Sequence, residues 1–400
     1  MPIDLGGSGV TGIHVNVYHG VRRLMGLCEK PIRVADYSQM LAEVEKEVLE
    51  RLNIDVVRID RVLEPCHPDV NRMGWRIWRN PQGIHIEFPE HLEIVEEAGY
   101  YKAYLRGLYS GRMPKDGYYF WWGIHAGIKP PLADAKTIED IKDFNWDQYK
   151  FTDEEIENLR KKAEWLYRNT EYAIVLPGVT KIGGLHDAGG QSLRGWDRWL
   201  SDLRIRKPLA EAVLDYIMEL YRYNIKRILN ALGEYVNVAI VAYDDLGTEE
   251  GPQISVQTFR EFYKHRYEEI ISYVKKYSKA FTRIHSCGSI HPFIKEFVDI
   301  GLDAIDPVQI SARGMDPVVL KRDFGEQIVF WGGGVDTQHI LPFAKEEEVI
   351  EHVKKLIEIF KPGGGYIYAP VHNIQPNTPP QNIIAIYTTA YKYGKYTVKT

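Results

Sequence analysis

Long hydrophobic runs are missing from this chain of 400 residues. No apolar stretch approaches the roughly 20 residues that a membrane-spanning helix needs, and the first residues do not read as a secretory signal peptide. Basic charge is not in excess either, because 50 Lys and Arg residues stand against 55 Asp and Glu residues, for a net charge of −5. Without a basic stripe, nothing in the sequence indicates nucleic acid as a partner. We therefore predict a cytoplasmic protein that binds neither a membrane nor nucleic acid.

Cysteine is also scarce, with three residues in the whole chain: Cys28, Cys66 and Cys287. So few cysteines in such a long chain do not make a disulfide framework. In a reducing compartment, each is either a buried apolar residue or a chemically active group.

What the chain does contain is a series of short apolar runs rich in β-branched residues, most of them continuous rather than alternating, as in parallel strands covered on both faces. Eight such runs are predicted as strands: Pro2–Leu5, Asp55–Asp60, Tyr172–Gly178, Val238–Asp245, Ala280–Cys287, Ala304–Gln309, Ile328–Gly334 and Tyr366–His372. Helical periodicity is predicted between them, over Met40–Leu52, Pro208–Leu232, Ser255–Ser278, Pro292–Ile300, Asp316–Phe324 and Glu346–Phe360.

Alternation of strands with helices predicts a parallel sheet, and eight such units predict a closed α/β barrel of the (β/α)8, or TIM-barrel, type. The alternative is an open doubly wound sheet, but no glycine-rich dinucleotide motif follows the first strand. We predict one domain over residues 1–400, with an insertion or lid at 61–171 between strands two and three. In that segment, Gly74–Phe88 is predicted to be a hairpin that turns at residues 80–83, and Tyr118–Trp122 is an aromatic cluster. The segment either covers the catalytic face or is a surface elaboration with its own core.

In a barrel of this type, the active site is built from the carboxyl ends of the strands. The predicted strand ends carry Tyr243, Asp244 and Asp245, then His285 and Cys287, then Asp306 and Gln309, then Asp336, and finally His372 and Asn373. Asp244, Asp306 and Asp336 are the candidate catalytic residues, and Tyr243, Asp245, Gln309 and Asn373 are candidates for substrate binding. Because neighbouring strand residues face opposite ways, only one of Asp244 and Asp245 should face the barrel mouth, and we expect Asp244 to do so.

His285 and Cys287 are the strongest candidates for metal ligands, since strand residues two apart point to the same side and can reach one ion. Imidazole and thiolate together suit Zn2+ better than Mg2+ or Ca2+, which prefer oxygen ligands. We expect His372 to be the third ligand, with Cys66-His67 as the alternative. Three protein ligands leave a fourth position open, as in catalytic zinc sites. The competing interpretation of the pair is a buried cysteine beside a hydrogen-bonded histidine.

Several motifs in the same order resemble the uroporphyrinogen decarboxylase superfamily: residues 283–309 (RIHSCGSIHPFIKEFVDIGLDAIDPVQ), 244–264, 330–343 and 370–383. The arginine-rich motif that binds substrate carboxylates in the decarboxylase itself is missing from the opening MPIDLGGSGVTGIHV. The chain opens at the first predicted strand, without the helical leader common in the superfamily, so a start further upstream is an expectation.

The resemblance implies the other large branch, the cobalamin-dependent zinc methyltransferases, in which H-x-C is followed near the last strand by a cysteine. His285 and Cys287 match the first two positions, and His372 stands where that cysteine would be. Exchanging a thiolate for neutral imidazole leaves zinc a stronger Lewis acid, which favours a pterin acceptor or an activated demethylation substrate over a thiol.

The implied function is methyl transfer between a corrinoid protein and a thiol or pterin, with methylcobalamin supplied by that partner. A homodimer is compatible with this. Two alternatives stay open: a metal-free decarboxylase of porphyrinogens, and a non-catalytic barrel that binds a corrinoid or tetrapyrrole.

Overall fold

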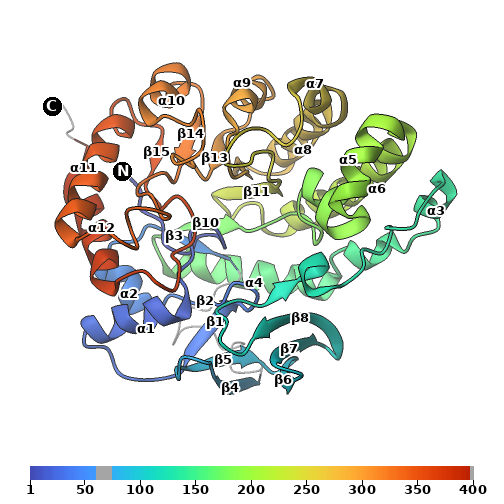
Figure 1. Ribbon diagram of the computed structural model, residues 1–400. Helices are drawn as coiled ribbons and strands as arrows, with labels where there is room; N and C mark the ends of the chain where they lie inside the picture. Colours follow the sequence, from blue (N-terminus) through green and yellow to red (C-terminus); the bar gives the residue numbers. More distant parts are fainter. Residues whose placement is uncertain (60–73, 397–400) are drawn as a thin grey trace.

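The computed structural model describes residues 1–59 and 74–396. Its centre is a curled sheet of seven parallel strands, consistent with a TIM-like barrel and surrounded by helices (Figure 1). The strand order across this sheet is β15 (Tyr366–Ile367), β14 (Val329–Trp331), β13 (Ala304–Asp306), β12 (Phe281–His285), β11 (Val238–Tyr243), β10 (Ala173–Leu176) and β3 (Val56–Arg58). Seven of the predicted strands are thereby confirmed in sequential order.

The remaining predicted strand, Pro2–Leu5, forms an isolated parallel bridge between Ile3 and Tyr368 instead of a full strand. The Asp4 amide donates to Tyr368 O at 2.8 Å, and the Asp55 amide donates to Ile3 O at 2.9 Å. The segment therefore bonds to the chain at both edges of the sheet, beside β15 and just before β3, and it links them.

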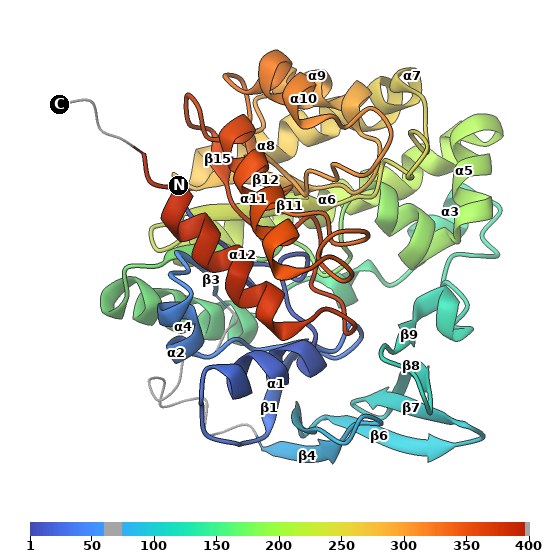
Figure 2. The same cartoon turned by 60° about the vertical axis from the view of Figure 1, so that its left-hand side comes forward.

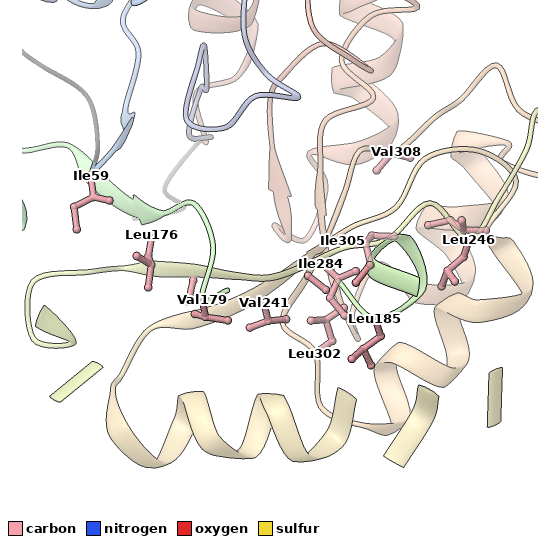
Figure 3. Close-up of a cluster of buried hydrophobic side chains, with 14 of the residues drawn as sticks. Ile59, Leu176, Val179, Leu185, Val241, Leu246, Ile284, Leu302, Ile305 and Val308 are labelled. Atoms are coloured by element: carbon pink, nitrogen blue, oxygen red, sulfur yellow. The ribbon is translucent and has the colours of Figure 1, made fainter. Parts of the chain in front are cut away.

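Both faces of the sheet are apolar, as the continuous runs in the sequence predict. On one face, Ile174 and Leu176 pack into the large core under the helices. On the other face, Val175, Val238 and Ile240 form a smaller cluster inside the curl, together with Trp331. In Figure 3, side chains from neighbouring strands, such as Val241, Ile284 and Ile305, gather in the core with Leu185 and Leu302.

Helices follow most strands and cover the outer face of the sheet. They are α1 (Val15–Leu24), α2 (Lys46–Arg51), α3 (Ile138–Lys142), α4 (Asp153–Asn169), α5 (Trp196–Ile205), α6 (Lys207–Leu232), α7 (Val256–Phe259), α8 (His265–Tyr277), α9 (His291–Asp299), α10 (Pro317–Phe324), α11 (Glu346–Phe360) and α12 (Pro380–Tyr393). Short 3-10 turns cover Gly123–Ala126 and Trp146–Tyr149, and π-helical turns cover Ala188–Arg194 and Arg260–Lys264. Within the described residues, no helix has the length and apolar character required to cross a membrane.

The predicted helix over Met40–Leu52 is wrong in its first part. Met40 has a φ of 51°, a backbone conformation that an α-helix of L-residues does not tolerate. Leu41–Ala42 instead forms β2, which pairs antiparallel with β1 (Ile32–Asp36). The helix begins only at Lys46. The predicted helix over Ser255–Ser278 is confirmed, with a π-helical turn in the middle of it.

The segment between β3 and α4 carries most of two additional four-stranded sheets. The first has the order β2, β1, β5 (His85–Pro89) and β4 (Trp75–Arg79), and the second runs β6 (Leu92–Glu97), β7 (Tyr100–Leu105), β8 (Leu108–Pro114) and β9 (Trp121–Trp122). The predicted hairpin is confirmed, since β4 and β5 pair antiparallel around residues 80–83. Both views show β4, β6, β7 and β8 together near α1, to one side of the barrel (Figures 1 and 2).

Candidate metal centre and cavity

Three side chains with metal-binding atoms meet where β11 and β12 end. One ligand atom each from Asp245, His285 and Cys287 lies within 4.8 Å of the other two. The Nε2 atom of His285 is 3.5 Å from Cys287 Sγ and 3.3 Å from Asp245 Oδ1. This contact shows that His285 and Cys287 face the same region, as their spacing of two residues predicts, although β12 itself ends at His285.

The expected orientation of the acidic pair is wrong, because Asp245 and not Asp244 joins this cluster. The ladder between β11 and β12 shifts register between Ile240 and Ala242. Such a bulge reverses the alternation of side chains beyond it. Val238 and Ile240 point inside the curl, but Ala242 packs on the outer face and Tyr243 on the inner one.

Asp244 consequently holds the loop after β10. Its carboxylate accepts the Leu185 and Asp187 backbone N–H groups, each at 2.7 Å, and the hydroxyl of Tyr267. Burial raises the pKa of Asp244 to about 6, against the opposing effect of these donors. Gly184 is required here, because a Cβ at this position would lie 2.1 Å from Asp244 Oδ2. Both carboxylate oxygens of Asp244 therefore accept backbone hydrogen bonds.

His285 lies between Asp245 and the fully buried Asp306. Its Nδ1 atom is 3.9 Å from Asp306 Oδ2, and Asp306 in turn pairs with the buried Arg283. Burial alone would lower the pKa of His285, but the negative charge of Cys287 and the bond to Asp245 raise it well above its usual value. Burial favours neutral Asp245, yet the bond to His285 lowers the pKa of this carboxyl to about 2.

Backbone hydrogen bonds at Cys287 itself and at the next residue, Gly288, hold this part of the chain in place. The Cys287 amide donates to Asp245 Oδ1 at 3.0 Å, and the Gly288 amide donates to Gln309 Oε1 at 2.7 Å. Gly288 has a φ of 82° and lies so close to Gly247 that a Cβ would be 2.5 Å from its carbonyl carbon. Burial raises the pKa of the Cys287 thiol, but the positive charge of His285 outweighs this and lowers it.

His372 comes from the other edge of the sheet, after β15. Its ring centroid lies 6.5 Å from that of His285. Its Nδ1 atom is 2.7 Å from Asn373 Oδ1. An amide oxygen can only accept, so Nδ1 carries a proton, and in the neutral ring Nε2 is the atom with the lone pair. Burial lowers the pKa of His372, but a hydrogen bond to Cys287 outweighs this and raises it.

A cavity of about 590 Å3 borders His372. Its aromatic and apolar lining consists of Tyr118, Tyr119, Pro342, Val371 and Pro376. Its polar lining consists of Gln309, Thr337, Gln338, His372, Gln375 and Asn377. Of the predicted aromatic cluster of residues 118–122, Tyr118 and Tyr119 line the cavity, and Trp121 and Trp122 are not part of its lining. Tyr118 is nevertheless as exposed as the two tryptophans.

Comparisons with known proteins agree with this architecture. The family model for uroporphyrinogen decarboxylase (URO-D) matches residues 188–393, just over half of the chain. The chain belongs to the uroporphyrinogen decarboxylase family. No curated protein sequence matches it.

Among solved structures, a methyltransferase from Methanosarcina mazei is 15% identical, with a TM-score of 0.52, over 96% of this chain and 100% of that chain. At this identity the likeness shows a shared fold alone. A putative vitamin-B12 independent methionine synthase from Listeria monocytogenes is 12% identical over 98% of both chains, with a TM-score of 0.40. The overlap with that synthase is too low to support any inference about this family member.

The donor set of this family member fits a zinc ion. Imidazole nitrogen, thiolate sulfur and carboxylate oxygen are the three donor types that zinc takes in proteins. His285 and Cys287 supply the first two, and Asp245 completes the cluster as a third. His372, the third ligand expected from the sequence, lies outside that cluster, with its ring centroid 6.5 Å from that of His285. The alternative ligand pair Cys66-His67 lies outside the described residues.

The other predicted site residues lie around this centre in different roles. The Tyr243 ring packs 5.6 Å from that of His285, centroid to centroid. Asp336 accepts the Gln338 and His339 amides at 2.7 and 3.0 Å, so it shapes the loop after β14. The side-chain amide of Asn373 donates to Gln39 Oε1 at 2.6 Å, which fixes the group that orients His372.

Sequence reasoning missed Asp187, Gln39 and the separate role of Tyr119. The Asp245 amide donates to Asp187 Oδ1 at 3.0 Å, so Asp187 holds the acidic cluster from the loop after β10. The Tyr119 hydroxyl donates to Gln375 Oε1 and joins the insertion to the loop after β15. No spacing in the sequence connects residues so far apart.

Proposed function

We propose that this chain is a zinc-dependent methyltransferase that moves a methyl group between a corrinoid protein and a small-molecule acceptor, either a thiol or a pterin. The proposal treats the curled sheet, bridged by residues 2–4, as a closed (β/α)8 barrel. The observation that carries it is the convergence of His285, Cys287 and Asp245 within 4.8 Å at the carboxyl ends of neighbouring strands. Membership in the uroporphyrinogen decarboxylase family supports an enzyme.

In this proposal, His285, Cys287 and His372 hold the zinc ion, and Asp245 is the competing third ligand. Bound zinc would supply a Lewis acid that activates the methyl acceptor. Asp306 lies beside Nδ1 of His285, as the outer carboxylates of metal-binding histidines do, and orients the ring. If His372 is the ligand, Asp245 is the carboxylate next to the metal that would take the proton that the acceptor loses, although its Oδ1 also accepts the Cys287 amide.

The catalytic roles expected for Asp244 and Asp336 do not suit their contacts, because both carboxylates are occupied by backbone N–H groups. Asp306 is paired with Arg283. We therefore propose positioning roles for these three residues and keep Asp245 for proton transfer.

Zinc content measured by elemental analysis tests the proposal first. About one zinc ion per chain is expected in the wild type, with strong loss in Cys287→Ser, because a hydroxyl is a far poorer zinc ligand than a thiolate. Cys28→Ser is the matched control, since Cys28 is an exposed free cysteine elsewhere in the chain. Comparing His372→Ala with Asp245→Asn then identifies the third ligand by the larger loss. Unchanged zinc in Cys287→Ser would contradict the site.

Turnover tests the reaction. The zinc-loaded protein should demethylate methylcobalamin in the presence of a thiol or a pterin, which the absorption spectrum of the corrinoid reports. Zinc without turnover would favour the non-catalytic barrel. Release of CO2 from a porphyrinogen by metal-free protein would favour the decarboxylase.

A further inference from the structure

The cavity beside His372 lacks the arginine and lysine side chains that would pair with the carboxylates of a porphyrinogen. Among the described residues, none of those that line it is Lys, Arg, Asp or Glu. Its polar groups are four side-chain amides, a threonine, two tyrosines and His372. Apart from His372, the lining offers an ionised group no opposite charge in exchange for the water it loses, which is unfavourable.

Two of the amides in the lining, those of Gln309 and Gln338, donate hydrogen bonds to the same carboxylate, that of Glu249. Gln309 Nε2 donates to Glu249 Oε1 at 2.6 Å, and Gln338 Nε2 donates to the same oxygen at 2.8 Å. Glu249 does not line the cavity, but its negative charge lies next to it and repels an anionic ligand. The amide of the buried Gln309 is held before any ligand binds, and that of the exposed Gln338 is oriented by Glu249 and Ser311. Such preset orientation lowers the entropy cost of recognition.

The insertion contributes two further residues to the lining. Tyr118 and Tyr119 present aromatic rings, and the hydroxyl of Tyr119 donates to Gln375 Oε1. The backbone carbonyl of Tyr118 accepts a hydrogen bond from Nε2 of His14 at 3.0 Å, which connects the insertion to the segment before α1. A lining that combines aromatic rings with hydrogen-bonded amides suits a flat ring that carries hydrogen-bonding groups.

We propose that this cavity binds an uncharged ligand with a planar ring and amide or hydroxyl substituents, and that Gln338, Gln375 and Tyr119 determine this specificity. The inference rests on the proposed function, for which it names the class of the methyl acceptor or of the demethylated substrate. It disfavours polycarboxylates and phosphorylated compounds as ligands of this cavity.

Three ring compounds of nearly equal shape test the proposal: benzamide, benzoate and benzamidine, which are neutral, anionic and cationic. Their binding to the full chain is measured by ligand-observed NMR titration. Benzamide should bind most tightly, with benzoate at least about tenfold weaker because its carboxylate would be buried unpaired. Equal or tighter binding of benzoate or benzamidine would overturn the proposal.

Two variants locate the binding. Gln338→Leu should weaken benzamide binding about three- to tenfold, as expected for loss of one hydrogen bond, and Tyr119→Phe should do the same. The hydrogen bonds of Gln338 to Glu249 and Ser311 do not involve His372 or its partner Asn373, so the metal centre is left intact. Gln327→Leu is the matched control, because Gln327 is exposed and follows α10, away from the cavity lining. Equal affinity in wild type, Gln338→Leu and Tyr119→Phe would refute the assignment.

Failure of the zinc proposal gives a different pattern. If elemental analysis finds no zinc while benzamide still binds selectively and depends on Gln338, the cavity assignment stands and the methyltransferase does not. If zinc is present and the three compounds bind alike, the zinc site stands and the cavity assignment does not.

Discussion

Acidification should lower the stability of the fold through one buried histidine, His14. His14 is 1% exposed, accepts the Asn16 N–H at Nδ1 (3.1 Å) and donates from Nε2 to Tyr118 O (3.0 Å). The proton of a charged imidazole on Nδ1 would point at the Asn16 N–H and break the first of these bonds. Burial, which disfavours the charged ring, lowers the pKa of His14 from 6.5 to about 4, and the bond to Tyr118 opposes this only in part.

The sign follows from linkage. Between pH 6.5 and 4 the unfolded chain binds a proton at His14 that the folded chain excludes, so stability is lost as the pH falls through this window. A shift of this size corresponds to about 3 kcal/mol in full, of which about 2 kcal/mol is lost by pH 5.

The assay is urea unfolding of metal-free protein at pH 7.5 and pH 5, so that protons and zinc do not compete. His14→Gln keeps a donor for Tyr118 but does not titrate in this range. The variant should start less stable and lose about 2 kcal/mol less than the wild type on acidification, since all other groups titrate in both proteins. An identical pH dependence of the two free energies of unfolding would refute the reasoning.

Two further outcomes follow from the site. Asp244→Ala should lower the free energy of unfolding by about 2–5 kcal/mol, because two buried N–H groups lose their acceptor. Its zinc content should match the wild type, and a selective loss of zinc in a stable variant would show that Asp244 is a ligand after all. Asn373→Leu removes the acceptor that orients His372 and should weaken zinc affinity about 10- to 100-fold if His372 is a ligand. Competition with a chelator measures this, and unchanged affinity would favour Asp245.

The sequence by itself determined the parts of the fold that depend on neighbours along the chain. Continuous apolar runs predicted the parallel strands, because burial on both faces demands apolar side chains at every position. The turn at residues 80–83 predicted its hairpin, and the two-residue spacing of His285 and Cys287 put both on one side.

Tertiary structure decided what depends on pairing between distant segments. The bulge in β11 arises from its register with β12, and it placed Asp245 instead of Asp244 beside His285. The contact of Tyr119 with Gln375 joins residues that are 256 positions apart, and no periodicity encodes it. Alternation within a strand is a local property of the backbone, whereas a bulge or a cavity wall exists only once another segment has packed against it.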